Sequence, residues 1–133
     1  MKIFLVRHAQ GEGTEKYWQS PKTGLSKKGI KQSTLLANRL IPYNIDLIIT
    51  SGWARSLQTA EIISKKINKS IEIVQKIHER KQSSIIYGLS RTDNLAKEYW
   101  QSFLKNRNDW DYKWDKEEET FAELTIRAIE FKE

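Results

Sequence analysis

The sequence predicts an α/β protein built on a mainly parallel sheet. Three short runs of strand-forming residues occupy residues 2–6, 46–50 and 70–74. The first two runs are continuously apolar rather than alternating, as in strands that are covered on both faces. Helical patterns lie between the runs, so the order of elements is βαβαβ. Such a chain folds most simply into a parallel sheet with right-handed crossovers.

Two helices are expected between these strands. Ser26 is a favourable N-cap for the first helix, which carries apolar residues near one face and ends around Pro42. The second helix has a single apolar stripe at three- and four-residue spacing, formed by Leu57, Ala60, Ile63 and Ile67. Each stripe is of the kind that packs against a sheet.

Composition limits the chemistry. The 133 residues, 38% of them hydrophobic, suit one domain that buries roughly two-thirds of its unfolded surface. The chain has no cysteine, so disulfides and thiolate metal sites are excluded, and its two histidines would need carboxylates to hold zinc. We therefore expect neither cofactor nor metal. No signal peptide or membrane-spanning run is visible, so a cytoplasmic location is expected.

The positive charge is scattered rather than concentrated. The net charge of +6 comes from 23 Lys and Arg against 17 Asp and Glu. An acidic run at residues 115–119 interrupts any continuous phosphate track, which argues against nucleic acid as a partner. The charge favours anionic small molecules instead. The sequence does not specify an oligomeric state.

Polar residues with a shared chemistry follow the three predicted strands. Arg7 and His8 end the first strand, Arg55 follows the second, and Glu79 follows the third. Ligands bind past the carboxyl ends of strands in open parallel sheets, and Arg55 also lies at a helix start, which favours a phosphate. Each residue alone is more often an ordinary surface group. Together they indicate a phosphoryl-transfer site.

Five segments of the chain resemble the histidine phosphatase superfamily, which has the phosphoglycerate mutase-like fold. They are FLVRHA at residues 4–9, LSKKGIKQ at 25–32, TSGWARSLQTA at 50–60, the acid Glu79, and ETFAEL at 119–124. The resemblance covers nearly the whole chain. It implies a three-layer α/β/α domain over residues 1–133, with a helical cap segment at about 80–118.

The resemblance also implies a mechanism. His8 would attack the phosphorus of a phosphorylated small molecule and form a phosphohistidine, while Arg7 and Arg55 hold the phosphate oxygens. Glu79 would protonate the leaving oxygen, which requires burial and the phosphate dianion to raise its pKa toward neutrality. It would then activate the water that hydrolyses the phosphohistidine. No metal is required.

One departure from the family concerns its second histidine, which follows a late helix. The only other histidine here is His78, which we interpret as a loop residue. Two interpretations stay open. Either residues 1–133 are the first two-thirds of a longer protein, which we favour, or the chain is a degenerate member of the family.

The reaction type also has alternatives. Residues 10–14 (QGEGT) and the late position of Tyr87 and Gly88 differ from the mutase pattern, so a phosphatase is favoured over a mutase. A non-catalytic module that binds phosphorylated ligands is the third hypothesis. In the cap, we expect Tyr99, Trp110 and Trp114 to pack the cap onto the domain rather than to contact substrate.

Overall fold

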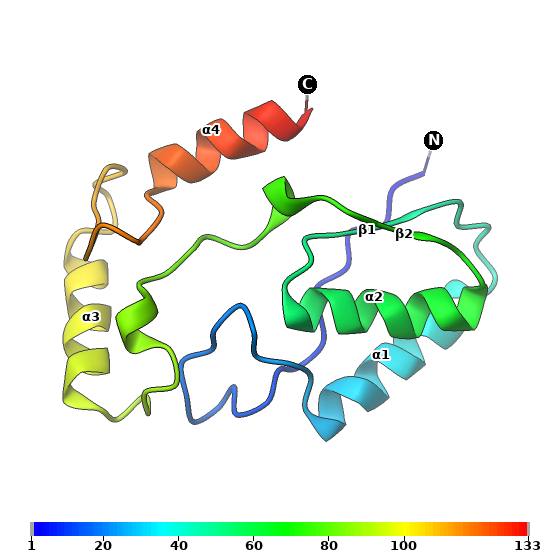
Figure 1. The fold of residues 1–133 in the computed structure, drawn as a ribbon, viewed down its shortest axis with the longest axis horizontal. Helices are drawn as coiled ribbons and strands as arrows, with labels where there is room; N and C mark the ends of the chain where they lie inside the picture. Colours follow the sequence, from blue (N-terminus) through cyan, green and yellow to red (C-terminus); the bar gives the residue numbers. More distant parts are fainter. Residues whose placement is uncertain (1, 133) are drawn as a thin grey trace. The chain divides into compact units, whose positions relative to one another are not determined.

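The computed structural model describes residues 2–132, and the chain divides into two compact units (Figure 1). Unit 1 contains residues up to 12 together with 21–75, and unit 2 contains 13–20 together with residues from 76 onward. The chain therefore crosses between units three times. Each unit is described by itself.

Unit 1 contains the parallel strands. Strand β1 (Ile48–Thr50) pairs with β2 (Ile71–Ile73), and Ile48 lies opposite Ile71. The helix α2 (Ala54–Ile67) connects them, while α1 (Lys27–Leu40) packs against α2 (Figure 1). The parallel pairing predicted for residues 46–50 and 70–74 is confirmed, with shorter strands.

Helix α1 begins and ends where the sequence predicts, and Arg55 lies at the start of α2 as expected. Ser26 is the N-cap of α1, and its hydroxyl accepts a hydrogen bond from the Gly29 N–H at 3.0 Å. The helix ends two residues before Pro42, and α2 ends at Asn68 in the left-handed conformation with φ 54°. Between the helices lies a small core made of Ala37, Leu40 and Ile63. Each buried Leu or Ile side chain contributes about 1.5–3 kcal/mol.

The first predicted strand does not form. Residues 2–10 contain no strand in the described chain, and Leu5 is 97% exposed. Only Phe4 of this run packs against the unit 1 core. In the described residues the sheet consists of β1 and β2, so residues 2–6 have no backbone ladder to either strand. Ile49 of β1 is also exposed, so the expected coverage of both faces is wrong.

Unit 2 contains α3 (Asn94–Lys105), α4 (Phe121–Lys132) and the short 3-10 turn η2 (Ser84–Ile86). Its core is aromatic: Tyr99 of α3 meets Trp18 edge-on, with ring centroids 5.5 Å apart, and meets Trp114 at 5.9 Å. Trp110 is exposed. Tyr99 and Trp114 therefore pack inside unit 2, and the expected packing of the cap onto the rest of the domain stays a prediction.

A buried polar network extends this core. The Arg80 guanidinium lies over the rings of Phe103 and Phe121 at 5.2 and 5.1 Å, and its Nη1 is 3.0 Å from Oε1 of Glu118. The Tyr99 hydroxyl donates to the same oxygen at 2.6 Å. Burial and the Glu118 carboxylate raise the pKa of Tyr99 well above its ordinary value. The phenol therefore stays protonated and keeps donating to Glu118.

Helix α4 begins with a reciprocal cap. The Thr120 hydroxyl accepts a hydrogen bond from the Glu123 N–H at 3.0 Å, and the Glu123 carboxylate accepts one from the Thr120 N–H at 2.8 Å. Two backbone donors that a helix start leaves unpaired are thereby satisfied. Helix α4 thus begins inside the segment 119–124 that resembles the family.

Thr120→Ala should lower the free energy of unfolding by about 1 kcal/mol, because it removes the side-chain half of this cap. Chemical denaturation measures the change. Thr125→Ala is the matched control: its hydroxyl donates to the Phe121 carbonyl, which already belongs to the helix, and should cost no more than about 0.5 kcal/mol. Equal losses in the two variants would contradict the assignment of the cap.

Candidate functional site

The imidazole of His8 is held by its own backbone neighbour. Its Nδ1 lies 2.9 Å from the carbonyl oxygen of Ala9. A carbonyl can only accept, so Nδ1 must carry the proton in this contact. In the neutral ring the lone pair then belongs to Nε2, the nitrogen that a nucleophilic histidine would use. His8 is half-buried, which limits the directions that the ring can take.

The residue after His8 is tied to the start of α2. The Ala9 N–H donates to the Thr59 hydroxyl at 3.1 Å, and that hydroxyl donates to the Arg55 carbonyl at 2.8 Å. Thr59 is buried, so these bonds are shielded from competing water. The two segments that carry His8 and Arg55 are therefore joined through one threonine, although they lie far apart in the sequence.

The backbone at Gln10 is held by the first turns of α1. Its N–H donates to the Gln32 side chain at 3.0 Å, and its carbonyl accepts from the Ser26 N–H at 3.0 Å. A Cβ at Gly29 would lie 2.1 Å from the same carbonyl oxygen, so only glycine allows this approach. Further on, the Gln58 side chain accepts from the Leu25 N–H at 2.7 Å.

These contacts assign a physical role to motif residues that sequence reasoning had only matched by type. Gly29, Gln32 and Thr59 do not belong to the predicted phosphate site, yet they fix the backbone directly after His8. The feature of the sequence that could have revealed these residues is their fixed spacing within the motifs at residues 25–32 and 50–60. We name the set Ser26, Gly29, Gln32 and Thr59 the loop frame.

The two predicted phosphate ligands differ in exposure. Arg55 is only 4% exposed, is the second residue of α2, and donates from Nη1 to the Thr23 carbonyl at 3.4 Å. Arg7 is exposed next to His8. Unit 1 thus contains the predicted nucleophile and both predicted arginines. A buried guanidinium at a helix start is a fixed positive charge of the kind that binds phosphate.

The predicted acid lies in unit 2. Glu79 follows η1 (Gln75–Ile77) in a segment without regular structure, and it is exposed. The expectation that burial surrounds this carboxyl is therefore wrong. Because Glu79 and His8 belong to different units, their approach stays a prediction. His78 is a loop residue, as interpreted from the sequence, and its Nδ1 lies 2.6 Å from the Glu79 carbonyl.

Residues 2–132 contain no group of three or more His, Asp or Glu side chains arranged to hold a metal ion. None of the helices described is both long enough and apolar enough to cross a membrane.

The chain belongs to the histidine phosphatase superfamily (branch 1), because the model of that family matches residues 3–133. A protein of Schizosaccharomyces pombe named as a probable phosphatase is 36% identical over 134 residues, which cover 98% of this chain and 58% of the relative. The family that the motifs resemble is thereby confirmed.

Solved structures share the fold. An alpha-ribazole phosphatase from Shigella flexneri superimposes with a TM-score of 0.75 at 20% identity, covering 95% of this chain and 62% of that one. A mycobacterial glucosyl-3-phosphoglycerate phosphatase gives 0.75 at 19% identity, covering 93% and 58%. The predicted phosphoglycerate mutase-like α/β fold is confirmed. The chain spans less than two-thirds of the length of each of these relatives.

Gly29→Ala should destabilise the chain by about 1–3 kcal/mol, because the added methyl group meets the backbone of Gln10. The sign of the change in the free energy of unfolding is informative, because a Gly→Ala change inside an unobstructed helix stabilises the protein by about 1 kcal/mol. Thermal or urea unfolding measures it. Lys28→Ala, an exposed neighbour in the same turn, is the control and should change stability by less than about 0.5 kcal/mol. A stabilised Gly29→Ala variant would show that the loop frame does not hold in solution.

Proposed function

We propose that this chain carries the phosphohistidine-forming site of a phosphomonoester hydrolase that needs no metal. The observation that carries the proposal is the hydrogen bond from His8 Nδ1 to the Ala9 carbonyl. It leaves the lone pair on Nε2, and the loop frame fixes the backbone that aims the ring. A histidine held in one tautomer beside arginines is suited to accept a phosphoryl group.

The first half of the reaction transfers the phosphoryl group to the ring. Nε2 of His8 attacks the phosphorus, and the bond from phosphorus to the ester oxygen breaks with its electron pair on that oxygen. Glu79 donates a proton to the departing alkoxide. Arg7 and Arg55 hold the equatorial oxygens and offset the charge that spreads over them, which is the work that a metal ion does elsewhere.

The second half restores the enzyme. A water molecule attacks the phosphohistidine, and the carboxylate of Glu79 takes one of its protons. The bond from phosphorus to nitrogen breaks, Nε2 regains its electron pair, and inorganic phosphate leaves. Because Glu79 is exposed, we propose that the bound phosphate dianion rather than burial keeps its carboxyl protonated for the first half.

Two observations favour hydrolysis over a mutase reaction. The curated relative that matches almost the whole chain is named a phosphatase, and the solved structures named above are phosphatases as well. Residues 10–14 also lack the mutase pattern. We propose a phosphorylated small molecule as the substrate.

Turnover of an aryl phosphate in the presence of a metal chelator tests the proposal. His8→Ala should lower kcat/KM by at least about a thousandfold, because the nucleophile is lost. Mass spectrometry of the quenched enzyme should find an acid-labile, base-stable phosphoryl group on His8. Lys66→Ala, an exposed change on α2, is the control and should retain full activity.

Two results would contradict the proposal. Activity that disappears with the chelator would require a metal. Phosphate binding by a folded chain, with neither turnover nor a labelled His8, would instead support the non-catalytic binding module.

A further inference from the structure

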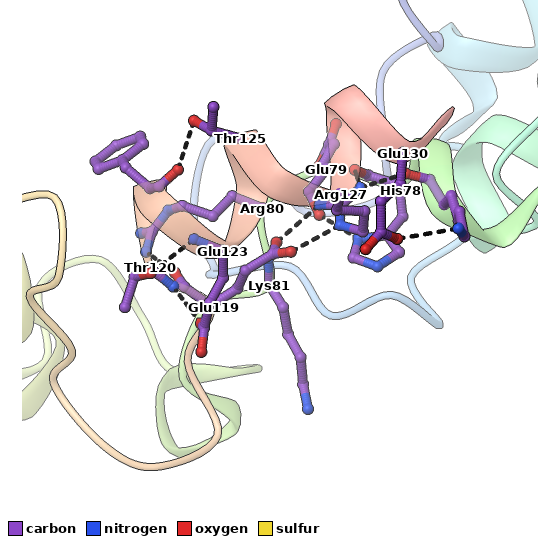
Figure 2. A network of polar contacts seen from close by, with 12 residues as sticks. His78, Glu79, Arg80, Lys81, Glu119, Thr120, Glu123, Thr125, Arg127 and Glu130 are labelled. Atoms are coloured by element: carbon purple, nitrogen blue, oxygen red, sulfur yellow. Dashed lines mark hydrogen bonds and ion pairs between the residues drawn. The ribbon is translucent and has the colours of Figure 1, made fainter. Parts of the chain in front are cut away.

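In unit 2, an ion pair between Arg127 on α4 and Glu119 just before that helix lies against the segment that carries Glu79 (Figure 2). Arg127 projects from α4, and its Nε and Nη2 lie 2.7 and 2.8 Å from the two carboxylate oxygens of Glu119. This is the two-bond geometry that makes arginine–carboxylate pairs strong and directional. The side chains are only 16% and 13% exposed, so water screens the pair weakly.

Both partners also bind the backbone around Glu79. Nη1 of Arg127 donates to the carbonyls of Lys76 and His78, the latter at 3.0 Å. Glu119 accepts from the Lys81 N–H at 3.1 Å, and its own N–H donates to the Lys81 carbonyl at 2.9 Å. The held positions lie before and after Glu79 (Figure 2). We name the pair Arg127 and Glu119, with these backbone contacts, the clamp.

The segment depends on the clamp because its own backbone lacks regular structure. After η1 ends at Ile77, residues 78–83 form neither helix nor strand. A backbone without ladder bonds is held by side chains or by water. Here the clamp supplies hydrogen bonds on both sides of Glu79. An exposed carboxyl on such a segment can be aimed only as well as the segment itself is held.

The charge state of Glu119 suits this role. Burial raises its pKa, but the hydrogen bonds from Arg127 and from the Lys81 N–H outweigh burial, so the net pKa lies below the ordinary value. The carboxylate is therefore charged at neutral pH and pairs fully with the guanidinium.

A neighbouring ion pair is solvent-exposed and serves as a comparison for the clamp. Lys76 and Glu130 join the same segment to the same helix at 3.0 Å, but their side chains are 54% and 52% exposed. Exposed pairs of this kind contribute little to stability. Glu130 therefore offers a matched control for the clamp.

We propose that Arg127 and Glu119 are positioning residues for the carboxyl of Glu79. The inference rests on the proposed function, which assigns proton donation to Glu79. The clamp fixes the backbone at residues 76, 78 and 81 and thereby the direction from which Glu79 reaches the leaving oxygen. The proposal assigns neither clamp residue a contact with the substrate. Loosening the clamp therefore weakens proton donation and leaves the attack by His8 unchanged.

Leaving-group dependence separates this role from a structural one. A nitrophenolate leaves readily without a proton, whereas an alkoxide requires one. For both esters, kcat/KM reports the steps up to departure of the leaving group. Glu79→Gln should therefore slow an alkyl phosphate by about a hundredfold or more, and a nitrophenyl phosphate by much less.

Arg127→Gln should show the same selectivity, with at least about a tenfold loss for the alkyl ester and less than about threefold for the nitrophenyl ester. Arg127→Lys keeps the charge but loses the fork, so its loss should be intermediate. In a Glu79→Gln background, Arg127→Gln should cause no further loss, because the two changes act through one group. Glu130→Gln should change neither ester by more than about twofold.

Amide hydrogen exchange gives a readout that needs no turnover. Arg127→Gln should speed exchange at the Lys81 and Glu119 N–H groups at least about tenfold, whereas Glu130→Gln should not. Unchanged exchange in Arg127→Gln would overturn the inference, as would equal losses for both esters or a further loss in the Glu79→Gln background. If Glu79→Gln itself slows both esters equally, the assignment of the acid fails, and a positioning role for the clamp fails with it. If exchange is unchanged in Arg127→Gln but Glu79→Gln still slows mainly the alkyl ester, the clamp inference fails while the proposed function stands.

Discussion

The carbonyl oxygen of Gln10 lies so close to the first turn of α1 that a single methyl group at Gly29 would collide with it. This approach lets the Ser26 N–H and the Gln32 side chain bind the backbone of Gln10 from one helix. On the other side, Thr59 binds the Ala9 N–H from α2. The backbone that directly follows the histidine of the candidate site is therefore held from two helices. Preorganisation of this kind reduces the reorganisation that a reaction must otherwise supply.

In unit 2 a backbone segment is also held by side chains, but the side chains are of a different kind. In unit 1 the holding groups are neutral: a hydroxyl, an amide and a glycine. In unit 2 they are charged, because Arg127 and Glu119 bind the segment around Glu79 and Arg80 meets Glu118 in the aromatic core. Neutral contacts tolerate a nearby phosphate without competing for it. Charged contacts are stronger, but a buried charge is costly unless an opposite charge pairs with it. Each of the charged groups named here has such a partner.

Local sequence signals predicted the elements that depend on local chemistry. Ser26 caps α1 as expected, and β1 and β2 pair in parallel. The strand predicted at residues 2–6 does not form. A strand needs hydrogen bonds to a neighbouring strand, and the apolar pattern around Leu5 does not specify that neighbour. In the candidate site, residue type and order predicted His8 and Arg55, and their catalytic roles stay predictions. The roles of Thr59 and Arg127 could not be predicted, since each acts on backbone groups that are distant in sequence.

The exposed apolar side chains of Leu5 and Ile49 have a practical consequence for anyone who handles this chain. Solvent-exposed apolar groups are bound by chaperones, and they cause unfolded or partly assembled chains to aggregate. We expect such exposed side chains to favour self-association of the chain at high concentration. Detergent, dilution or a solubilising fusion acts on exposed apolar groups of this kind.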